Sequence, residues 1–570
     1  MPQTDSQPLS ISAQRRKLKN EIAWHYAQIA GLKAQFNALN PISALPNELI
    51  AKIFRFYAFL NGVPFDLTWT RVMLVCRKWH AIALAEQPLW SFVRQGFSSF
   101  VHYRSLKRVL TQLDRSGAAP LTVEMQSSDS RLFTDSLLEH TDRLREVKIR
   151  GESVHTMQFL HSLASHSLPL LRSITVDPGY KWEEVPETLN TCPPALFDGR
   201  APQLTSLDVK IASVDWSLFR GLTRLSLEGA ADTKLPPTNI LDVLEASPGL
   251  TYIRLARVLT RQVLVGETRV VSLPNLGVLW IQDDVEICAS FIRHISVAPT
   301  AHLLLYGYGI QTGGDVTDLL IPVRKHVRGP SAPAIRCLQL DASGEGNLPN
   351  SPPQHLRICA STAPGEPNSL KTKSAYISVN SHPNTGHALR QILSKVLKAL
   401  PSHTVTHLEC RSARHFSVAS WKTALALLPS LEVIYAFADY GAERLFHTLT
   451  ELTEAPKPGV GFPVNLRHVH LRVYVWEARD DEEDMRVIAA NVLTALKRLL
   501  AVRVAAESPL GLLEIEEGGS GVVVSEEEWR ELSEQVGSLT RNGYPYVTRR
   551  MLAGLDQAED SRSSDEGDEE

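Results

Sequence analysis

The sequence predicts an α/β protein in which a small all-helical module near the N-terminus precedes a long array of repeated strand-and-helix units. Three observations support this prediction. The chain has 570 residues, which is long for one ordinary compact core. Large apolar residues recur at helical spacing between residues 42 and 90. From about residue 140 onward, one short pattern of apolar residues returns again and again.

Composition and charge narrow the class of protein. Apolar residues make up 44% of the chain and charged residues 21%, which is typical of a folded protein in water. The formal net charge of −3 gives no basic excess for binding nucleic acid, and no apolar run is long enough to span a bilayer. The six cysteines are scattered without a Cys-x-x-Cys pair, and the N-terminus has no signal-peptide core. We therefore expect reduced thiols and a location in the cytosol, the nucleus or both.

A helix is expected over residues 11–40, which contain no proline and only one glycine before Pro41 ends the run. Apolar residues recur at steps of three and four once the polar residues Arg15 and His25 are included, which is the heptad rhythm of a coiled coil. The apolar members are Ile11, Leu18, Ile22, Ile29, Leu32, Phe36 and Leu39. Two interpretations remain open: self-association through residues 11–39, or packing of the helix on its own domain.

Residues 41–95 are predicted to form the helical module. Leu45-Pro46 places a proline at a helix start, where its missing N–H costs nothing. One apolar face of this first helix is formed by Leu49, Ile53, Phe54 and Tyr57. A second helical run is expected to carry Met73, Leu74, Cys76, Trp79, Ile82 and Ala83. Because about fifty residues barely enclose a core, apolar side chains left over should contact another protein; alternatively, they simply fill a local core.

This module resembles the F-box-like domain, with its Leu-Pro-x-Glu start and its Val-Cys-x-x-Trp and Leu-Trp ending. The matching residues are Leu45, Pro46, Glu48, Leu49, Ile53, Phe54, Val75, Cys76, Trp79, Leu89 and Trp90. A longer connection at residues 61–65 departs from the family pattern and leaves the middle helix undefined. Overall the chain resembles F-box-like proteins of the kind common in mushroom-forming fungi.

The F-box resemblance implies docking onto the Skp-type linker subunit of a cullin–RING ubiquitin ligase. The residues expected to make that contact are Leu45, Pro46, Leu49, Ile53 and Trp79. Val75, Cys76 and Trp90 are expected to build the core of the module itself.

The repeated pattern is a leucine-like residue, two variable positions, an apolar residue, one variable position and another apolar residue. Its copies begin at Leu144, Leu171, Leu204, Leu222, Leu250, Leu276, Ile335, Val405, Leu431 and Leu466. The last two apolar positions alternate with polar ones, as in a short strand, and helical segments lie between the copies at residues 157–163, 240–244 and 424–427. Strand and helix at roughly 18- to 35-residue intervals resemble irregular leucine-rich repeats, which stack into a solenoid. An ordinary βαβ sheet is the alternative.

Further features complete the predicted organisation. Residues 344–368 are rich in Pro, Gly, Ser and Asn and are expected to be a protruding loop, and residues 455–459 form a similar break. A helix over residues 483–504 and a last strand at Leu510, Leu513 and Ile515 should end the stack. The predicted domains are thus 1–40 (amphipathic helix), 41–95 (F-box-like), 96–545 (repeat solenoid) and 546–570 (disordered acidic tail).

The exposed strand positions are the predicted surface for binding a target protein. The principal candidates are Lys148, Arg150, Lys210, Arg254, Trp280 and Gln282. Further candidates on the same pattern are Asp208, Gln339, Glu409, Arg411, His470 and Arg472. Trp280 stands out because an aromatic residue on an exposed strand face is typical of an interface anchor. A charged strand surface with no binding role is the alternative for the others.

The sequence offers little for enzyme chemistry. It contains no His-Glu-x-x-His zinc motif, no phosphate-binding Gly-Lys-Ser/Thr loop and no Gly-x-Ser-x-Gly elbow. His468 and His470 share a strand face, but a zinc site needs two further ligands close by. We therefore expect no catalytic residues, no metal site and no cofactor.

The hypothesis is a non-catalytic adaptor that recognises substrates for a Skp–cullin–F-box type ubiquitin ligase, with a linker protein, a cullin and an unidentified target as partners. A repeat scaffold with no ligase role is the alternative. A hydrolase within the repeats is a third hypothesis that no motif supports.

Overall fold

The computed structural model describes residues 10–545 apart from 61–63, 96–101, 128–130, 152, 178–199, 211–218, 230–233, 262–267, 311–315, 344–354, 364–372, 382–385, 455–464, 476–481 and 520–523. The acidic tail and the break at 455–459 lie outside the described residues. The chain forms two units, residues 1–218 and residues 219–570. Among the described residues, no helix has the length and apolar character needed to cross a membrane.

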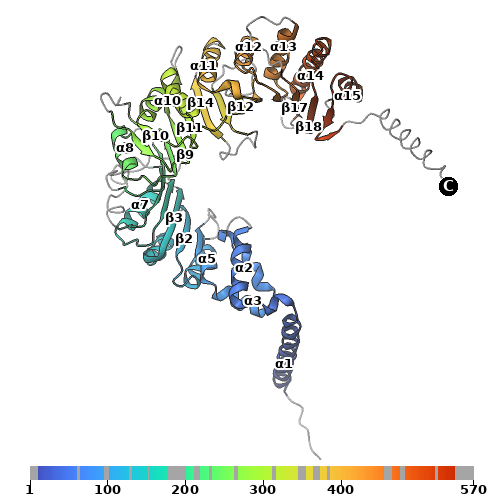
Figure 1. Cartoon of the computed structure of the whole chain (residues 1–570). Coiled ribbons are helices and arrows are strands. Elements are labelled where there is room, and N and C mark those ends of the chain that lie inside the picture. Colours follow the sequence, from blue (N-terminus) through green and yellow to red (C-terminus); the bar gives the residue numbers. More distant parts are fainter. Residues whose placement is uncertain are drawn as a thin grey trace, which may run out of the picture. The chain divides into compact units, whose positions relative to one another are not determined.

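The first unit begins with one long helix, α1 (Ile11–Ala38). Ser10 caps it, since its Oγ accepts a hydrogen bond from the backbone N–H of Ala13 at 3.3 Å. The predicted helix is therefore present, and Figure 1 shows it as a single rod. None of its residues is buried, so the interpretation in which it packs on its own domain is wrong for the described residues.

Short helices follow α1 and form the predicted module. They are η1 (Pro41–Ala44), α2 (Asn47–Leu60), η2 (Pro64–Asp66), η3 (Thr68–Leu74), α3 (Arg77–Ala85) and α4 (Gln87–Trp90). The middle element η3 is a 3₁₀-helix, and the expected continuous helix from Met73 to Ala83 is wrong. It breaks because Cys76 is extended and caps α3, its Sγ accepting from the backbone N–H of Trp79 at 3.5 Å.

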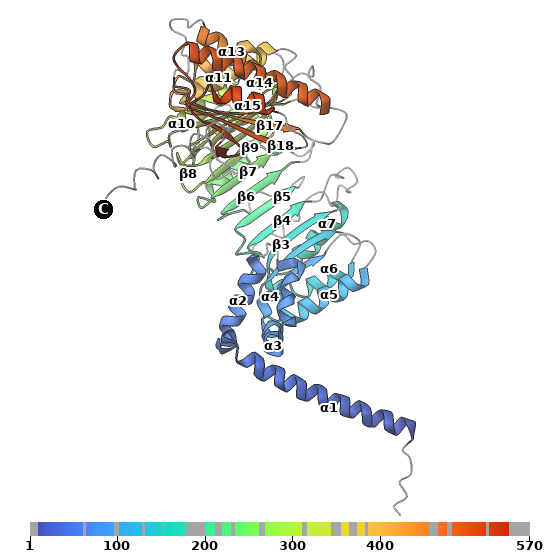
Figure 2. The ribbon, with the colours of Figure 1, turned by 90° about the vertical axis from the view of Figure 1, so that its right-hand side faces the viewer.

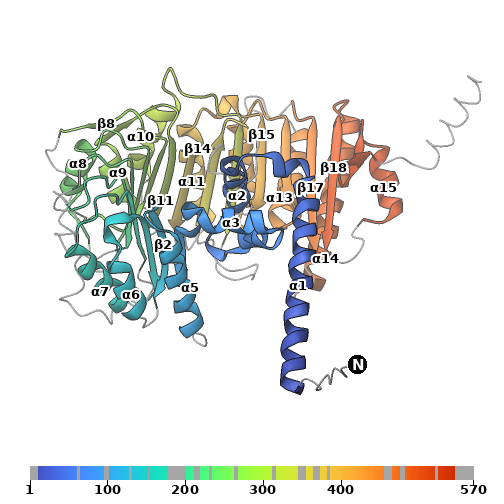
Figure 3. The same cartoon turned by 90° about the horizontal axis from the view of Figure 1, so that it is seen from below.

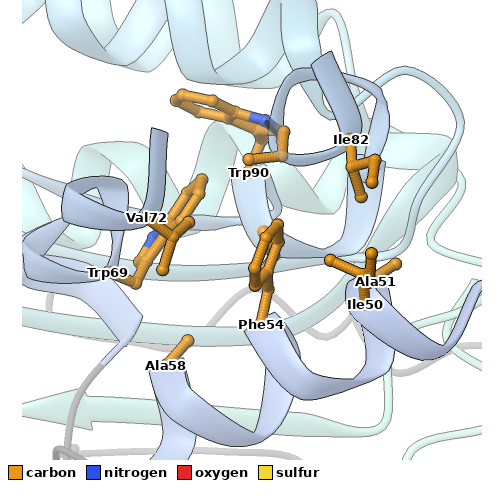
Figure 4. Packing of buried hydrophobic residues seen from close by; sticks show 10 residues of the cluster. Ile50, Ala51, Phe54, Ala58, Trp69, Val72, Ile82 and Trp90 are labelled. Atoms are coloured by element: carbon orange, nitrogen blue, oxygen red, sulfur yellow. Dashed lines mark hydrogen bonds between the residues drawn. The ribbon is translucent and has the colours of Figure 1, made fainter. Parts of the chain in front are cut away.

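The core of this module forms between α2, η3, α3 and α4. Four side chains of α2 are buried against it: Ile50, Ala51, Phe54 and Ala58. Figure 4 shows them facing Trp69, Val72, Ile82 and Trp90. Trp69 and Trp90 meet edge to face, with ring centroids 4.9 Å apart, and the Trp90 Nε1–H donates to the Ala83 carbonyl at 2.9 Å. The aromatic residues therefore hold the short helices together, and Trp90 is a core residue as expected.

The remainder of the first unit is a parallel sheet covered by helices. Its strands are β1 (Phe92–Gln95), β2 (Leu121–Ser127), β3 (Leu144–Gly151), β4 (Ser173–Asp177) and β5 (Ser206–Lys210), paired in that order. Its helices are α5 (His102–Arg115), α6 (Arg131–Leu138) and α7 (Ser153–Ala164). Figure 2 shows β3, β4 and β5 side by side. The sequence predicted β3, β4 and β5 but not β1 or β2.

The second unit continues the strand-and-helix rhythm. Its strands are β6 (Arg224–Glu228), β7 (Tyr252–Ala256), β8 (Val271–Leu273), β9 (Val278–Asp284), β10 (Ile295–Val297), β11 (His302–Ile310), β12 (Cys337–Ser343), β13 (His355–Ser361), β14 (Lys373–Ser381), β15 (His407–Ser412), β16 (Val433–Phe437), β17 (His468–Val475), β18 (Leu512–Gly519), β19 (Leu539–Arg541) and β20 (Tyr544–Pro545). Its helices are α8 (Pro237–Glu245), α9 (Val285–Ile292), α10 (Thr317–Val327), α11 (Gly386–Ala399), α12 (Val418–Ala426), α13 (Tyr440–Glu454), α14 (Glu482–Ala505) and α15 (Glu526–Ser533).

The helices of the second unit cover one face of its sheet. Helices α9 to α14 pack on one another in chain order, and Figure 1 shows them along one side of the strands. In the regular strands the apolar residues alternate toward these helices, so Leu279 and Ile281 of β9, for example, are fully buried. Consecutive parallel strands with all crossovers on one face are the geometry of a leucine-rich-repeat solenoid. For the described residues of the second unit, the alternative of an ordinary βαβ sheet is therefore wrong.

One segment interrupts the repeat. Strands β12 and β14 both pair antiparallel with β13, and this meander lies between β11 and β15, giving the order β11-β14-β13-β12-β15. The expected loop at residues 344–368 is therefore wrong over His355–Ser361, which form β13. Leu356, Ile358 and Ala360 of β13 are buried, as in the other strands. The sequence analysis missed this strand because the residues on either side of it are polar and rich in proline. Figure 3 shows β14, β15, β17 and β18 as strands of the same sheet.

Candidate protein-interaction surfaces

The face of α2 opposite its core carries a line of exposed apolar side chains, here named the α2 stripe: Leu49, Ile53, Phe56 and Leu60. Their spacing of four, three and four residues places them on one side of the helix. Leu49 is 47% exposed, Ile53 40%, Phe56 58% and Leu60 83%. Two of the five predicted linker-binding residues, Leu49 and Ile53, therefore belong to an uncovered apolar surface. Monomeric proteins rarely leave such surfaces without a partner.

The start of α2 is held by a lysine from α3. The Lys78 Nζ donates to the backbone carbonyl of Ser43 at 2.9 Å and to that of Leu45 at 3.3 Å. Leu45 is half-buried against the core, while Pro46 is exposed. Leu45 and Pro46, which are predicted to contact the linker subunit, are therefore held in position by Lys78, and Pro46 is accessible.

The turn between η3 and α3 adds a second exposed apolar group. Leu74 is 86% exposed and Val75 is 58% exposed. The expectation that Val75 builds the core is wrong, because the chain turns outward where η3 ends, whereas Cys76 is half-buried as a helix cap. Trp79 is half-buried and packs edge to face on Phe54, with ring centroids 5.1 Å apart. Trp79 therefore serves the core as well as the surface.

Beside this module lies a basic groove that the sequence analysis missed. Its volume is about 600 Å³, and Leu67, Met73 and Trp90 supply its apolar surface. Its cationic side chains are Arg71, Lys107, Arg108 and Arg115, with His80 beside them. The Arg115 guanidinium lies over the Trp90 ring at 4.5 Å. The spacing of Lys107, Arg108 and Arg115 along one helix could have indicated a basic surface from the sequence. Only the folded structure places Arg71 in the same groove.

The polar strand positions of the first unit share one face of its sheet. Register places Arg94, Glu124, Lys148, Thr175 and Asp208 in one row across β1 to β5. Of the three predicted target-binding residues here, Lys148 is half-buried and Arg150 is exposed. The third, Lys210, forms an ion pair with Asp177 at 3.2 Å. The structure therefore brings these three residues onto one surface.

In the second unit, the three remaining target-binding candidates lie on neighbouring strands. Trp280 on β9 stacks on Tyr306 of β11 with centroids 5.1 Å apart, and the Arg254 guanidinium lies 5.1 Å from the centre of its ring. Arg254 also pairs with Glu228 at 2.9 Å, and Gln282 hydrogen-bonds to the Tyr308 hydroxyl. These contacts fix Trp280 on the sheet face that the helices leave uncovered.

Trp280 belongs to a small apolar cluster on that uncovered face. Leu304 and Cys359 are buried there, and Val278, Trp280 and Tyr306 pack against them. Among the described residues, the Nε1–H of Trp280 has no hydrogen-bond acceptor. We call this group the Trp280 cluster. Of its members, the sequence analysis singled out Trp280 alone, as a candidate interface anchor.

Farther along the same face, three histidines surround Tyr435 of β16. The Tyr435 ring lies 6.4 Å from His407, 6.0 Å from His468 and 5.3 Å from His470, measured between centroids. Burial lowers the pKa of His407 and that of His468 and raises the pKa of the Tyr435 hydroxyl. The imidazoles of His407 and His468 are therefore held in the neutral form to a lower pH than in an unfolded chain.

Glutamates from β18 partner this histidine group. His470 lies between two carboxylates, with its Nδ1 3.4 Å from Glu514 and its Nε2 3.3 Å from Glu516. Arg472 pairs with Glu516 at 2.6 Å, and likewise Arg411 with Glu409 at 2.6 Å. Among the described residues, no three metal-binding side chains converge on a common point. This part of the face therefore offers paired charges and aromatic rings for contact with another molecule.

Comparison with known protein families identifies the helical module. Residues 42–95 match the F-box-like family model, and a search of curated proteins finds no significant match. Among solved structures, the chain is similar to the leucine-rich repeat-containing protein LegL7 from Legionella pneumophila. The two are 13% identical over 66% of this chain and 92% of that one, with a TM-score of 0.26. The family match thus identifies residues 42–95 as an F-box-like domain, and the parallel strand-and-helix repeats that follow have leucine-rich-repeat geometry by their own strand pairing and helix packing.

Proposed function

We propose that this protein is a substrate-recognition subunit of a Skp–cullin–F-box type ubiquitin ligase. The F-box-like domain would dock on the Skp-type linker subunit, and through it on a cullin. The repeats would hold a target protein, acting in the cytosol or the nucleus. Such a subunit needs no reacting group of its own, because it accelerates ubiquitin transfer by raising the effective concentration of the target.

One observation supports the linker contact above the others: a domain matched to the F-box-like family leaves its α2 stripe uncovered. The exposed fractions of Leu49 and Ile53 show that the domain completes its core without them. Pro46 is exposed beside them, and Leu45 and Trp79 form the half-buried edge of the same side of the domain. A partner that covers the stripe would remove this apolar surface from water, which drives association.

Target recognition is proposed for the uncovered face of the sheet. Lys148, Arg150 and Lys210 are the candidates in the first unit, and Arg254, Trp280 and Gln282 are those in the second. Trp280 is the best anchor among them, because its stacking on Tyr306 pre-orders a large ring and lowers the entropy lost on binding. Its neighbours supply both charge and hydrogen-bonding groups at the rim.

Copurification tests the proposal directly. The full chain, expressed with a recombinant Skp-type linker subunit, should bring the linker with it. Changing Leu45 and Pro46 together to serine should abolish this capture. A matched control, Ile321→Ser, alters an exposed isoleucine of α10 and should retain the linker.

The alternative function, a repeat scaffold without a ligase role, predicts a different outcome. Failure of the folded wild-type chain to capture the linker would favour the scaffold. Capture that survives the double serine change would refute the proposed contact. Proximity labelling with and without proteasome inhibition would then identify the target, whose recovery should rise when degradation is blocked.

A further inference from the structure

The helix α1 carries an apolar seam, interrupted by Arg15 and His25, that nothing in the described chain covers. The large apolar residues of the seam, which extends to Leu39 just past the helix end, keep 48–83% of their surface exposed, from Ile29 at the lower limit to Leu39 at the upper. Apart from the neighbouring turn η1, where the Ser43 Oγ donates to the Asn37 carbonyl at 2.7 Å, α1 makes no extensive packing contact among the described residues. An apolar seam of this length in water requires a partner.

We propose that α1 pairs in parallel and in register with α1 of a second copy of the chain. The seam alternates steps of four and three, so its positions can be assigned as in a heptad. The inner a positions are Arg15, Ile22, Ile29 and Phe36, and the inner d positions are Ile11, Leu18, His25, Leu32 and Leu39. Isoleucine at a with leucine at d is the combination that favours two parallel strands.

The two polar seam residues favour an identical partner in the same direction. In a parallel pair His25 faces His25 and Arg15 faces Arg15, so neither is set against an apolar side chain. In an antiparallel pair that overlaps the whole seam, His25 faces Ile29 and Arg15 faces Leu39, which desolvates each polar group without a partner. The Arg15 pair lies near the end of the helix, where its long side chains reach water.

The charged residues that flank the seam also favour the parallel orientation. A parallel pair places Gln14 beside Lys19, Glu21 beside Tyr26 and Gln28 beside Lys33 of the other copy, with no like-charge contact among these flanking positions. The overlapping antiparallel pair places Lys19 beside Lys33 twice. The other basic residues of the helix, Arg16 and Lys17, lie at outer positions, where water screens them.

A parallel pair has a consequence for the proposed ligase. Because only Leu39 and Asn40 separate α1 from Pro41, both F-box-like domains of the dimer would follow from the same end of the paired helices. Two linker-binding surfaces would then lie near one another. The pairing itself does not depend on linker binding, so the two proposals can fail separately.

The mass of the full chain in solution, without the linker, tests the pairing. At about 50 µM, where even a micromolar dimer is mostly assembled, the wild type should have twice the monomer mass. Ile29→Glu should raise the dissociation constant by at least about 100-fold, because each dimer loses two buried isoleucines. The matched control Ala27→Glu, on the outer face of the helix, should stay dimeric. A monomeric wild type, or a dimer that survives Ile29→Glu, overturns the proposal.

A cysteine variant tests the orientation. Leu39→Cys should form an intermolecular disulfide under mild oxidation, since the two residues face each other across a parallel seam. In the antiparallel pair they would lie about 35 Å apart and could not react. Ala34→Cys, on the outer face, controls for non-specific oxidation, as does the wild type for its own cysteines. A dimer in which Leu39→Cys crosslinks no better than these controls overturns the parallel arrangement.

Discussion

Truncation of the α2 stripe gives a quantitative test of the linker contact. Leu49→Ala and Ile53→Ala each remove three carbons, worth about 0.8 kcal/mol apiece if fully transferred from water. Only the exposed part, 47% of Leu49 and 40% of Ile53, remains for a partner to cover. The double variant should therefore lose about 2 kcal/mol of binding free energy, a roughly 30-fold rise in the dissociation constant.

The measurement is a titration of immobilised linker subunit with the full chain. Because the rest of each side chain is already buried within the domain, the variant should unfold at a lower denaturant concentration than the wild type, so binding is measured where both proteins are folded. Ile321→Ala, which is 55% exposed on α10, is the matched control and should bind normally. An affinity within about 3-fold of the wild type, in a folded double variant, would refute the reasoning that the stripe is the docking surface.

The remaining predictions concern the core, the recognition face and pH. Phe54→Ala should destabilise the F-box-like domain by about 3–5 kcal/mol, seen as early unfolding in tryptophan fluorescence; an unchanged transition would contradict the core assignment. Trp280→Ala should weaken target capture about 30-fold in proximity labelling or pull-down and leave linker capture intact, and the converse pattern would exclude Trp280 as anchor. Burial lowers the pKa of His407 and of His468 below the ordinary 6.5. The unfolded chain therefore binds protons first, and stability should fall as the pH drops below about 6.5. Thermal unfolding of a variant with both changed to glutamine should show a shallower fall, whereas an equal slope would count against this origin.

The regular repeats were predictable from local pattern. Each predicted strand position, from Leu144 to Leu466, lies at or just before a strand of the structure, because alternation of buried and exposed residues is a local property. Strands that lack this pattern were missed. In β11 three consecutive leucines, Leu303, Leu304 and Leu305, are all buried, since the uncovered face is also apolar there. Because a continuous apolar run shows neither the two-residue period of a strand nor the 3.6-residue period of a helix, this strand could not be recognised from the sequence.

The surfaces were predicted less completely than the strands. Leu49 and Ile53 were identified from the family pattern, and both are exposed on α2; their contact with a linker subunit stays a prediction. Val75 was misassigned because its exposure depends on a break in the chain at Cys76, which helical spacing alone does not show. The basic groove was missed because Arg71 and Arg115 are distant in sequence and meet only in the folded domain.

The sequence by itself determined the order of the elements, the F-box-like pattern and the seam of α1, because spacing along one chain encodes which faces of helices and strands are apolar. Only the tertiary structure decided that β12, β13 and β14 form an antiparallel meander between β11 and β15. It also decided which apolar side chains stay uncovered. Strand pairing and burial depend on contacts between residues far apart in sequence, and a local sequence pattern does not predict such contacts.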